Sequence, residues 1–163
     1  MNNRRMLTLT ENTLIQAPVQ RCFDLSLSID LHRASTARTG ERAIAGVTSG
    51  LIGLNESVTW RARHFCVWQE MTVQITQMER PKYFQDTMLR GPFRSFQHDH
   101  YFVNSEGGHT EMTDVLRFSA PLPVAGRMAE LVLRPYLRRF LRERNSFIRR
   151  IAESEDWRSF FPA

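Results

Sequence analysis

Five segments that alternate between apolar and polar residues follow one another from Glu56 to Ser119 with only short breaks. This alternation predicts β-strands at about residues 56–65, 68–79, 82–90, 94–104 and 109–119. The turns at Arg80-Pro81, Gly91-Pro92 and Gly107-Gly108 are short enough to join consecutive strands as hairpins. The chain must therefore fold around an antiparallel meander that has one face to cover.

A long amphipathic helix is predicted after Pro121 and Pro123, and it extends to about Ser154. Its apolar stripe consists of Met128, Leu131, Val132, Leu137, Phe140, Leu141, Phe147, Ile148 and Ile151. Pro135 should bend this helix, because proline removes one backbone hydrogen bond and clashes with the preceding turn. A helix with such a wide apolar face needs a sheet to cover.

The first third of the chain predicts one strand and two short helices. Leucine and isoleucine alternate with threonine over about residues 6–16, which indicates a strand. Pro18 suits the first position of a helix that ends near Ser28, and a second short helix or turn is expected at Leu31–Ala34. Residues 35–55 contain several glycines and predict a loop with an irregular strand around residues 43–45.

This order of elements predicts an α+β fold. We expect a curved antiparallel sheet of about six or seven strands wrapped around a long C-terminal helix, with two short helices after the first strand. The 163 residues are enough for one domain, expected over residues 1–163, that buries about two thirds of its unfolded surface.

Cysteine usage and hydropathy favour a cytoplasmic protein. Cys22 and Cys66 lie in unrelated contexts, so two free, buried thiols are expected, as in a reducing compartment. No apolar run approaches the ~20 residues that span a bilayer, and no transmembrane segment is expected.

Arginine provides nearly all of the positive charge. The net charge is +5, and Lys82 is the only lysine among 22 basic residues. The densest stretch, Arg134 to Arg150, has apolar residues at helical spacing between its arginines. This spacing is typical of a solvated helix face, and a face that binds anions is the alternative. Nucleic acid is therefore not the expected partner.

Five sequence segments in this order resemble the START-like helix-grip superfamily (SRPBCC). They are WRARHF at 60–65, RPKYFQD at 80–86, GPF at 91–93, HDHYF at 98–102 and TEMTD at 110–114. The superfamily contains lipid-transfer domains, bacterial polyketide cyclases and aromatases, and plant pathogenesis-related ligand carriers. After Asp114 the chain departs from the usual Pro-x-Gly turn and has APLPV at 120–124. The resemblance implies a helix-grip fold with a cavity between the sheet and the last helix, but no particular substrate.

Strand alternation predicts which side chains face this cavity, because successive residues of a strand point to opposite faces. The expected strand residues are Trp60, His64, Phe84, Asp86, Met88, Phe96, His98, His100, Phe102, Met112, Asp114, Leu116 and Phe118. Phe140 is expected to join them from the apolar stripe of the helix. The predicted lining is aromatic and aliphatic with a few ionisable groups.

The ionisable groups allow three interpretations. A buried aspartate is costly without a partner, so Asp86 and Asp114 should pair with His98, His100, an arginine or backbone donors. The set is then a structural network, a means of orienting a mostly apolar ligand, or an acid–base pair built on Asp114 and a histidine. No catalytic residue is assigned among these candidates.

A metal ion is a separate possibility, because His98 and His100 lie on one face of a strand. The remaining ligands would have to come from His64, Asp86 or Asp114. The superfamily that the chain resembles is not generally metal-dependent, so no metal is assigned. The common nucleophile and nucleotide-binding motifs are missing, and no cofactor is expected.

Three functions from different classes remain open. The leading hypothesis is a protein that binds a hydrophobic or aromatic small molecule, lipid-like or polyketide-like, without catalysis. The second is a cyclase, aromatase or dehydratase that uses an inward histidine and aspartate. The third is an interaction module whose arginine-rich helix binds protein or RNA. The sequence leaves open whether the protein is a monomer or a dimer.

Overall fold

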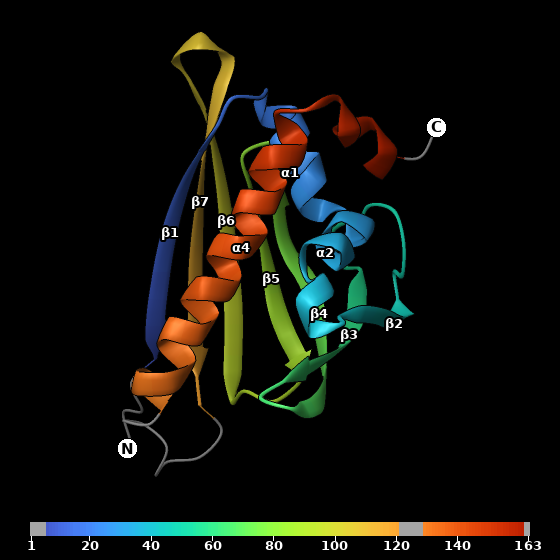
Figure 1. The fold of residues 1–163 in the computed structure, drawn as a ribbon, viewed down its shortest axis with the longest axis vertical. Helices are drawn as coiled ribbons and strands as arrows, with labels where there is room; N and C mark the ends of the chain where they lie inside the picture. Colours follow the sequence, from blue (N-terminus) through green and yellow to red (C-terminus); the bar gives the residue numbers. More distant parts are fainter. Residues whose placement is uncertain (1–5, 121–128, 162–163) are drawn as a thin grey trace.

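The computed structural model describes residues 6–120 and 129–161. Seven strands form one antiparallel sheet in the order β1-β7-β6-β5-β4-β3-β2 (Figure 1). Their bounds are β1 (Leu7–Ile15), β2 (Arg42–Gly46), β3 (Ser57–His64), β4 (Val67–Glu79), β5 (Tyr83–Arg90), β6 (Ser95–Ser105) and β7 (His109–Ser119). Each strand from β2 to β6 pairs with the next along the chain, and β1 closes against β7. The predicted meander of hairpins is confirmed.

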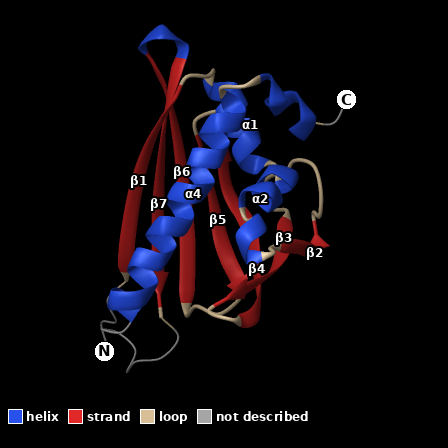
Figure 2. Cartoon of the chain, in the orientation of Figure 1, coloured by secondary structure: helices blue, strands red, loops and turns tan. Residues whose placement is uncertain are grey.

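The helices lie together on one side of the curved sheet, as Figure 2 shows. They are α1 (Val19–Leu27), α2 (Ile29–Ser35), α4 (Arg134–Ala152) and the 3-10 turns η1 (Ala37–Thr39) and η5 (Glu155–Phe160). A further 3-10 turn, η2 (Glu106–Gly108), lies apart from them at the tip of the β6–β7 hairpin. One π-helical turn, η4 (Ala129–Leu133), leads into α4. The helix-grip expectation of a long C-terminal helix over a curved sheet, with short helices after β1, is confirmed.

Local sequence explains where α1 and α2 begin. Pro18 directly precedes α1, whose buried face includes Phe23 and Leu27. Ser28 separates the two helices and caps the second, since its hydroxyl accepts a hydrogen bond from the backbone N–H of Leu31 at 3.2 Å. The two short helices follow each other with a sharp change of direction over the upper part of the sheet (Figure 1).

The C-terminal helix matches its prediction in the part that the structure describes. Its expected beginning, over residues 121–128, lies outside the described residues. Pro135 is the second residue of α4, directly after the π-helical turn, so the disruption expected at this proline lies at the junction of two helix types. α4 ends at Ala152, close to the predicted end at Ser154. Among the helices of residues 6–120 and 129–161, none combines the length and the apolar character needed to cross a membrane.

Burial follows the predicted alternation along β7. Met112, Asp114, Leu116 and Phe118 are buried on the face that the helices cover, while the residues between them are more exposed. The apolar core has two parts, one around Phe23 beneath α1 and a smaller one near the beginning of α4 that contains Leu9, Leu116, Phe118 and Leu141. The cavity described below lies between the sheet and α4.

One expectation about burial needs correction. Cys66 is exposed rather than buried, because it lies in the tight β3–β4 turn, whereas Cys22 is buried as expected, and both thiols are free.

Asp99 points to the outer face of the sheet, yet only 2% of it is exposed. Tyr83 and Gln85 donate hydrogen bonds to its carboxylate at 2.7 and 2.8 Å, and Arg117 pairs with it.

Candidate functional site

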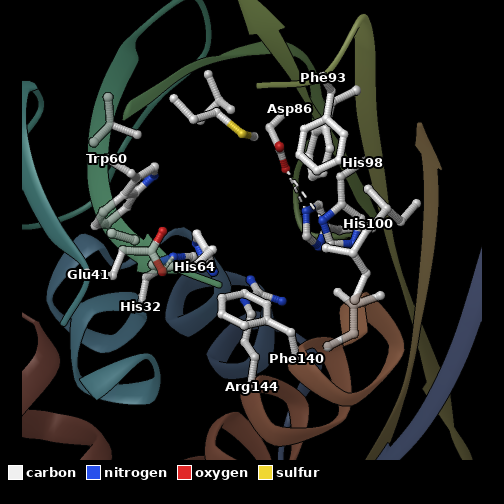
Figure 3. Close-up of a pocket in the computed structure, with 18 of the residues that line it drawn as sticks. His32, Glu41, Trp60, His64, Asp86, Phe93, His98, His100, Phe140 and Arg144 are labelled. Carbon is white, nitrogen blue, oxygen red and sulfur yellow. Dashed lines mark hydrogen bonds and ion pairs between the residues drawn. The ribbon is translucent and has the colours of Figure 1, made fainter. Parts of the chain in front are cut away.

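A cavity of about 360 Å³ lies between the inner face of the sheet and α4. Most of its lining is aromatic or aliphatic (Figure 3). Nine residues expected from the sequence line it: Trp60, His64, Phe84, Asp86, Phe96, His98, His100, Leu116 and Phe140. Their side chains come from β3, β5, β6, β7 and α4, so the site depends on the packing of the helix onto the sheet.

Five expected residues are not part of this lining among the residues described: Met88, Phe102, Met112, Asp114 and Phe118. Strand alternation correctly predicts that these side chains face the helices, but it does not predict whether other side chains cover them and keep them out of the cavity. The ring centroids of Phe102 and Phe23 of α1 are 5.3 Å apart, and those of Phe118 and Phe93 are 5.8 Å apart. Met112 is beside Ser26 of α1, Met88 packs against the larger core cluster, and Asp114 lies behind the two histidines of β6.

Other lining residues were not expected from the sequence, and they include His32, Glu41, Phe93, Tyr136 and Arg144. Helical spacing could have found two of them, because Tyr136 and Arg144 lie four residues before and after Phe140 on one helix face. His32 and Glu41 belong to α2 and to the segment before β2, where the sequence shows no periodic pattern. Only the tertiary structure brings them to the cavity.

The first polar cluster is centred on Asp114, whose side chain is completely buried. His98 Nε2 and His100 Nδ1 lie 2.9 and 2.8 Å from the same carboxylate oxygen, Oδ1, as close ion-pair contacts. The other oxygen accepts an aligned hydrogen bond from Asn145 Nδ2 of α4 at 2.7 Å. Arg144 adds its guanidinium at 3.7 Å. The expected pairing of Asp114 with histidine and arginine is confirmed.

Asp86 completes this cluster on the cavity side. Its Oδ2 forms a hydrogen bond with His100 Nε2 at 2.8 Å and lies 3.9 Å from His98 Nδ1. The Phe84 ring stacks on His100 with 4.1 Å between centroids. Strand register explains the arrangement, because His98 lies opposite Asp86 across the β5–β6 pair and His100 lies opposite Asp114 across the β6–β7 pair.

Burial and neighbouring charge act in opposite directions on this cluster. Burial alone would raise the pKa of both carboxyls, but contacts with His100 and His98 outweigh it, so the pKa of Asp86 is lowered and that of Asp114 lies well below its usual value. Burial and the charge of His100 lower the pKa of His98. Burial also opposes the charge on His100, yet Asp114 and Asp86 raise its pKa. The two carboxylates thus favour the charged form of the His100 imidazole, and the Arg144 guanidinium lies 3.7 Å from Asp114 Oδ1.

A second polar cluster lies across the cavity, around Glu41 (Figure 3). Its Oε2 lies 3.4 Å from His32 Nε2, and neither atom has an aligned hydrogen bond within the described residues. Trp60 stacks on His32 with 4.2 Å between ring centroids. His64 Nδ1 forms a hydrogen bond of 2.6 Å with the Tyr136 hydroxyl. Burial would raise the pKa of Glu41, but His32 and His64 outweigh it and lower that pKa.

Asp114 should be essential for stability. Asp114→Ala leaves two buried imidazoles and Asn145 without their partner, and we expect a loss of about 3–5 kcal/mol in the free energy of unfolding. Asp114→Asn keeps an acceptor oxygen and should cost less. Urea denaturation of both variants measures the effect. Thr113→Ala, on the opposite face of β7, is the control and should cost roughly 1 kcal/mol or less. Wild-type stability of Asp114→Ala would contradict this role.

Glu41 should make the free energy of unfolding depend on pH in the acidic range. Its folded-state pKa is lowered, so its contribution is present above the ordinary pKa of 4.5 and is lost as pH falls through the lowered value. Glu41→Gln lacks this titration. We therefore expect the difference in unfolding free energy between wild type and Glu41→Gln to shrink below pH 4.5, as measured by urea denaturation over a pH series. A difference that stays constant throughout the series would rule out this linkage.

Comparisons with known proteins give a fold. No family model and no curated protein matches the chain. Among solved structures, the Zhui aromatase/cyclase from Streptomyces sp. R1128 superposes with a TM-score of 0.74 at 10% identity, covering 91% of this chain and 94% of that one. A START superfamily protein from Mycobacterium smegmatis gives 0.68 at 9% identity, with 88% and 98% covered.

A plant protein shares the same architecture. Ginseng major latex-like protein 151 from Panax ginseng gives a TM-score of 0.63 at 14% identity, covering 91% of this chain and 99% of that one. Similarity in three dimensions at such low identity shows the fold and leaves the ligand open. The chain therefore has the START-like (SRPBCC) helix-grip fold that its five sequence segments predict.

Proposed function

We propose that this protein binds a small molecule of the lipid-like or polyketide-like class in the cavity between the sheet and α4. The observation that carries the proposal is a mostly apolar cavity with two separate polar clusters in its wall. Its volume of about 360 Å³ is within the range of roughly 300–1,000 Å³ for small-molecule sites. Such sites combine apolar walls with a few polar groups that fix the orientation of the ligand.

The polar groups favour a ligand with an aromatic body and oxygen-bearing substituents over a plain hydrocarbon chain. Asp86, His98 and His100 lie on one wall, and Glu41 with its histidine neighbours lies on another (Figure 3). A hydrocarbon would leave such groups desolvated without new hydrogen bonds, which is costly. Hydroxyl groups of a phenolic ligand can donate to Glu41 Oε2 or to Asp86. The Zhui structure is that of an aromatase/cyclase, which also supports a small-molecule ligand here.

The arginines of α4 support this proposal over a nucleic-acid partner. Arg138 and Arg142 both pair with Glu11 of β1 at 2.9 Å. Arg139 pairs with Glu143 at 2.8 Å. Part of the positive charge on this helix is thus balanced within the molecule, which weakens the attraction for phosphate groups.

Filling the cavity should prevent binding. Ala62 is a buried lining residue of β3, and Ala62→Phe places a ring in the space that a ligand would occupy. We expect the affinity for an apolar fluorescent probe such as anilinonaphthalene sulfonate to fall about tenfold or more. The control is Arg63→Phe, which introduces the same ring at the adjacent, exposed position of β3. Equal probe affinity in Ala62→Phe and Arg63→Phe would refute the proposal.

Acid–base catalysis in the same cavity is a second candidate, favoured by the histidines beside Asp86. The lowered pKa of His98 keeps its imidazole neutral, as a general base requires, and Nδ1 is its nitrogen nearer Asp86 on the cavity wall. Incubation with an enolisable poly-β-carbonyl compound tests for cyclisation or dehydration. We expect His98→Gln to lose turnover while it still binds the probe. Absence of turnover in the wild type would leave the binding function alone.

A further inference from the structure

We propose that Asp86, His98 and His100 form a binding site for a divalent transition-metal ion on the wall of the cavity. One potential ligand atom from each residue lies within 4.8 Å of the other two. The nearest pair is Asp86 Oδ2 and His100 Nε2 at 2.8 Å, and His98 Nδ1 lies 3.9 Å from the same oxygen. An ion held at about 2.0–2.2 Å needs tetrahedral ligand atoms roughly 3.4 Å apart, so it would displace the proton between Asp86 and His100 and open that contact slightly.

Asp114 gives these histidines the support that metal ligands usually have. A histidine that binds a metal through one ring nitrogen commonly contacts a carboxylate through the other. His98 Nε2 and His100 Nδ1 both lie within 2.9 Å of Asp114 Oδ1. Their remaining nitrogens, His98 Nδ1 and His100 Nε2, are the ones near Asp86. A single buried carboxylate therefore orients both imidazoles toward one point.

The supporting carboxylate is itself fixed in place. Asn145 of α4 donates a hydrogen bond to Asp114 Oδ2 at 2.7 Å, and Arg144 lies 3.7 Å from Oδ1. The ladder register of β5, β6 and β7 sets the backbone positions of all three proposed ligands. This preorganisation distinguishes the cluster from a chance grouping of histidines, because both the ligand shell and its support are built on strands.

The sequence pattern alone could not make this distinction. His98 and His100 supply two ligands on one face, and Asp114 and Asp86 are both possible third ligands. The structure separates their positions, since Asp114 is fully buried behind the rings whereas Asp86 lines the cavity with both histidines. Two imidazoles and one carboxylate suit a borderline ion such as Zn²⁺, Co²⁺ or Fe²⁺. The open coordination positions would face the cavity, where an oxygen atom of a bound ligand can reach them.

Zn²⁺ titration of the full-length protein by isothermal calorimetry, after treatment with a chelator, tests the site. We expect one equivalent to bind, and Co²⁺ in its place to give the visible absorption bands of a nitrogen- and oxygen-coordinated ion. Asp86→Asn and His98→Gln should each abolish this binding. Asp114→Asn, which removes only the support, should weaken it about 10- to 100-fold. His64→Ala, a cavity histidine outside the proposed ligand set, is the matched control and should bind as the wild type does.

Each alternative outcome overturns the proposal. Equal Zn²⁺ affinity of Asp86→Asn and the wild type would place the ion outside the proposed ligand set. Loss of binding in His64→Ala but not in Asp86→Asn would place it at the Glu41 cluster. Circular dichroism of Asp86→Asn, in which the amide oxygen can still accept from His100, verifies that the fold is intact. Binding of the apolar probe does not depend on the ion. If Zn²⁺ does not bind, the proposal of a ligand-binding cavity is unaffected. If the probe does not bind, the Zn²⁺ titration still tests the metal site.

Discussion

The contact of α4 with the buried carboxylate of Asp114 is the interaction on which the site depends. Apolar packing alone holds a helix against a sheet but tolerates small rotations, because the hydrophobic effect is not directional. Asn145 and Arg144 project from α4 to Asp114 on β7, and the histidines of β6 approach the same carboxylate from the strand beside it. Removing any partner would leave a buried polar group unsatisfied, so the helix has one favoured orientation, and that orientation brings Phe140 into the cavity wall.

Strand alternation and turn residues in the sequence are enough to predict most of the fold. The hairpin turns specify that consecutive strands pair, and the period of two specifies which face of each strand is inward, as burial along β7 shows. The same period of two also predicts that Asp86 and Asp114 pair with the histidines, because an inward aspartate has few other means of remaining charged. This inference used only strand faces and the cost of burying a charge, both of which are local properties.

The features that escaped prediction depend on depth and on contacts between distant segments. Met112 and Phe118 are inward yet covered by other side chains, which no strand period encodes. Glu41 reaches the cavity from a segment that has no periodic pattern. Asp99 lies on the outward side of β6, where a solvated carboxylate is the ordinary expectation, and it is buried because Tyr83, Gln85 and Arg117 on adjacent strands converge on it. Each case requires knowledge of which neighbours are long enough to cover a position.

The free-energy cost of burying charged groups in the two inner clusters is an argument that they serve a function. An apolar core would stabilise this fold without burying charge, and replacing buried ion pairs by apolar residues is often neutral or favourable. The Asp114 cluster at least stabilises the orientation of α4. In the Glu41 cluster, Glu41 Oε2 and His32 Nε2 face each other at 3.4 Å without an aligned hydrogen bond in the described part of the chain, and both residues line the cavity. In the proposed binding function, a polar group of the ligand would satisfy these atoms, and an analogue without that group would leave them desolvated, which would make binding selective.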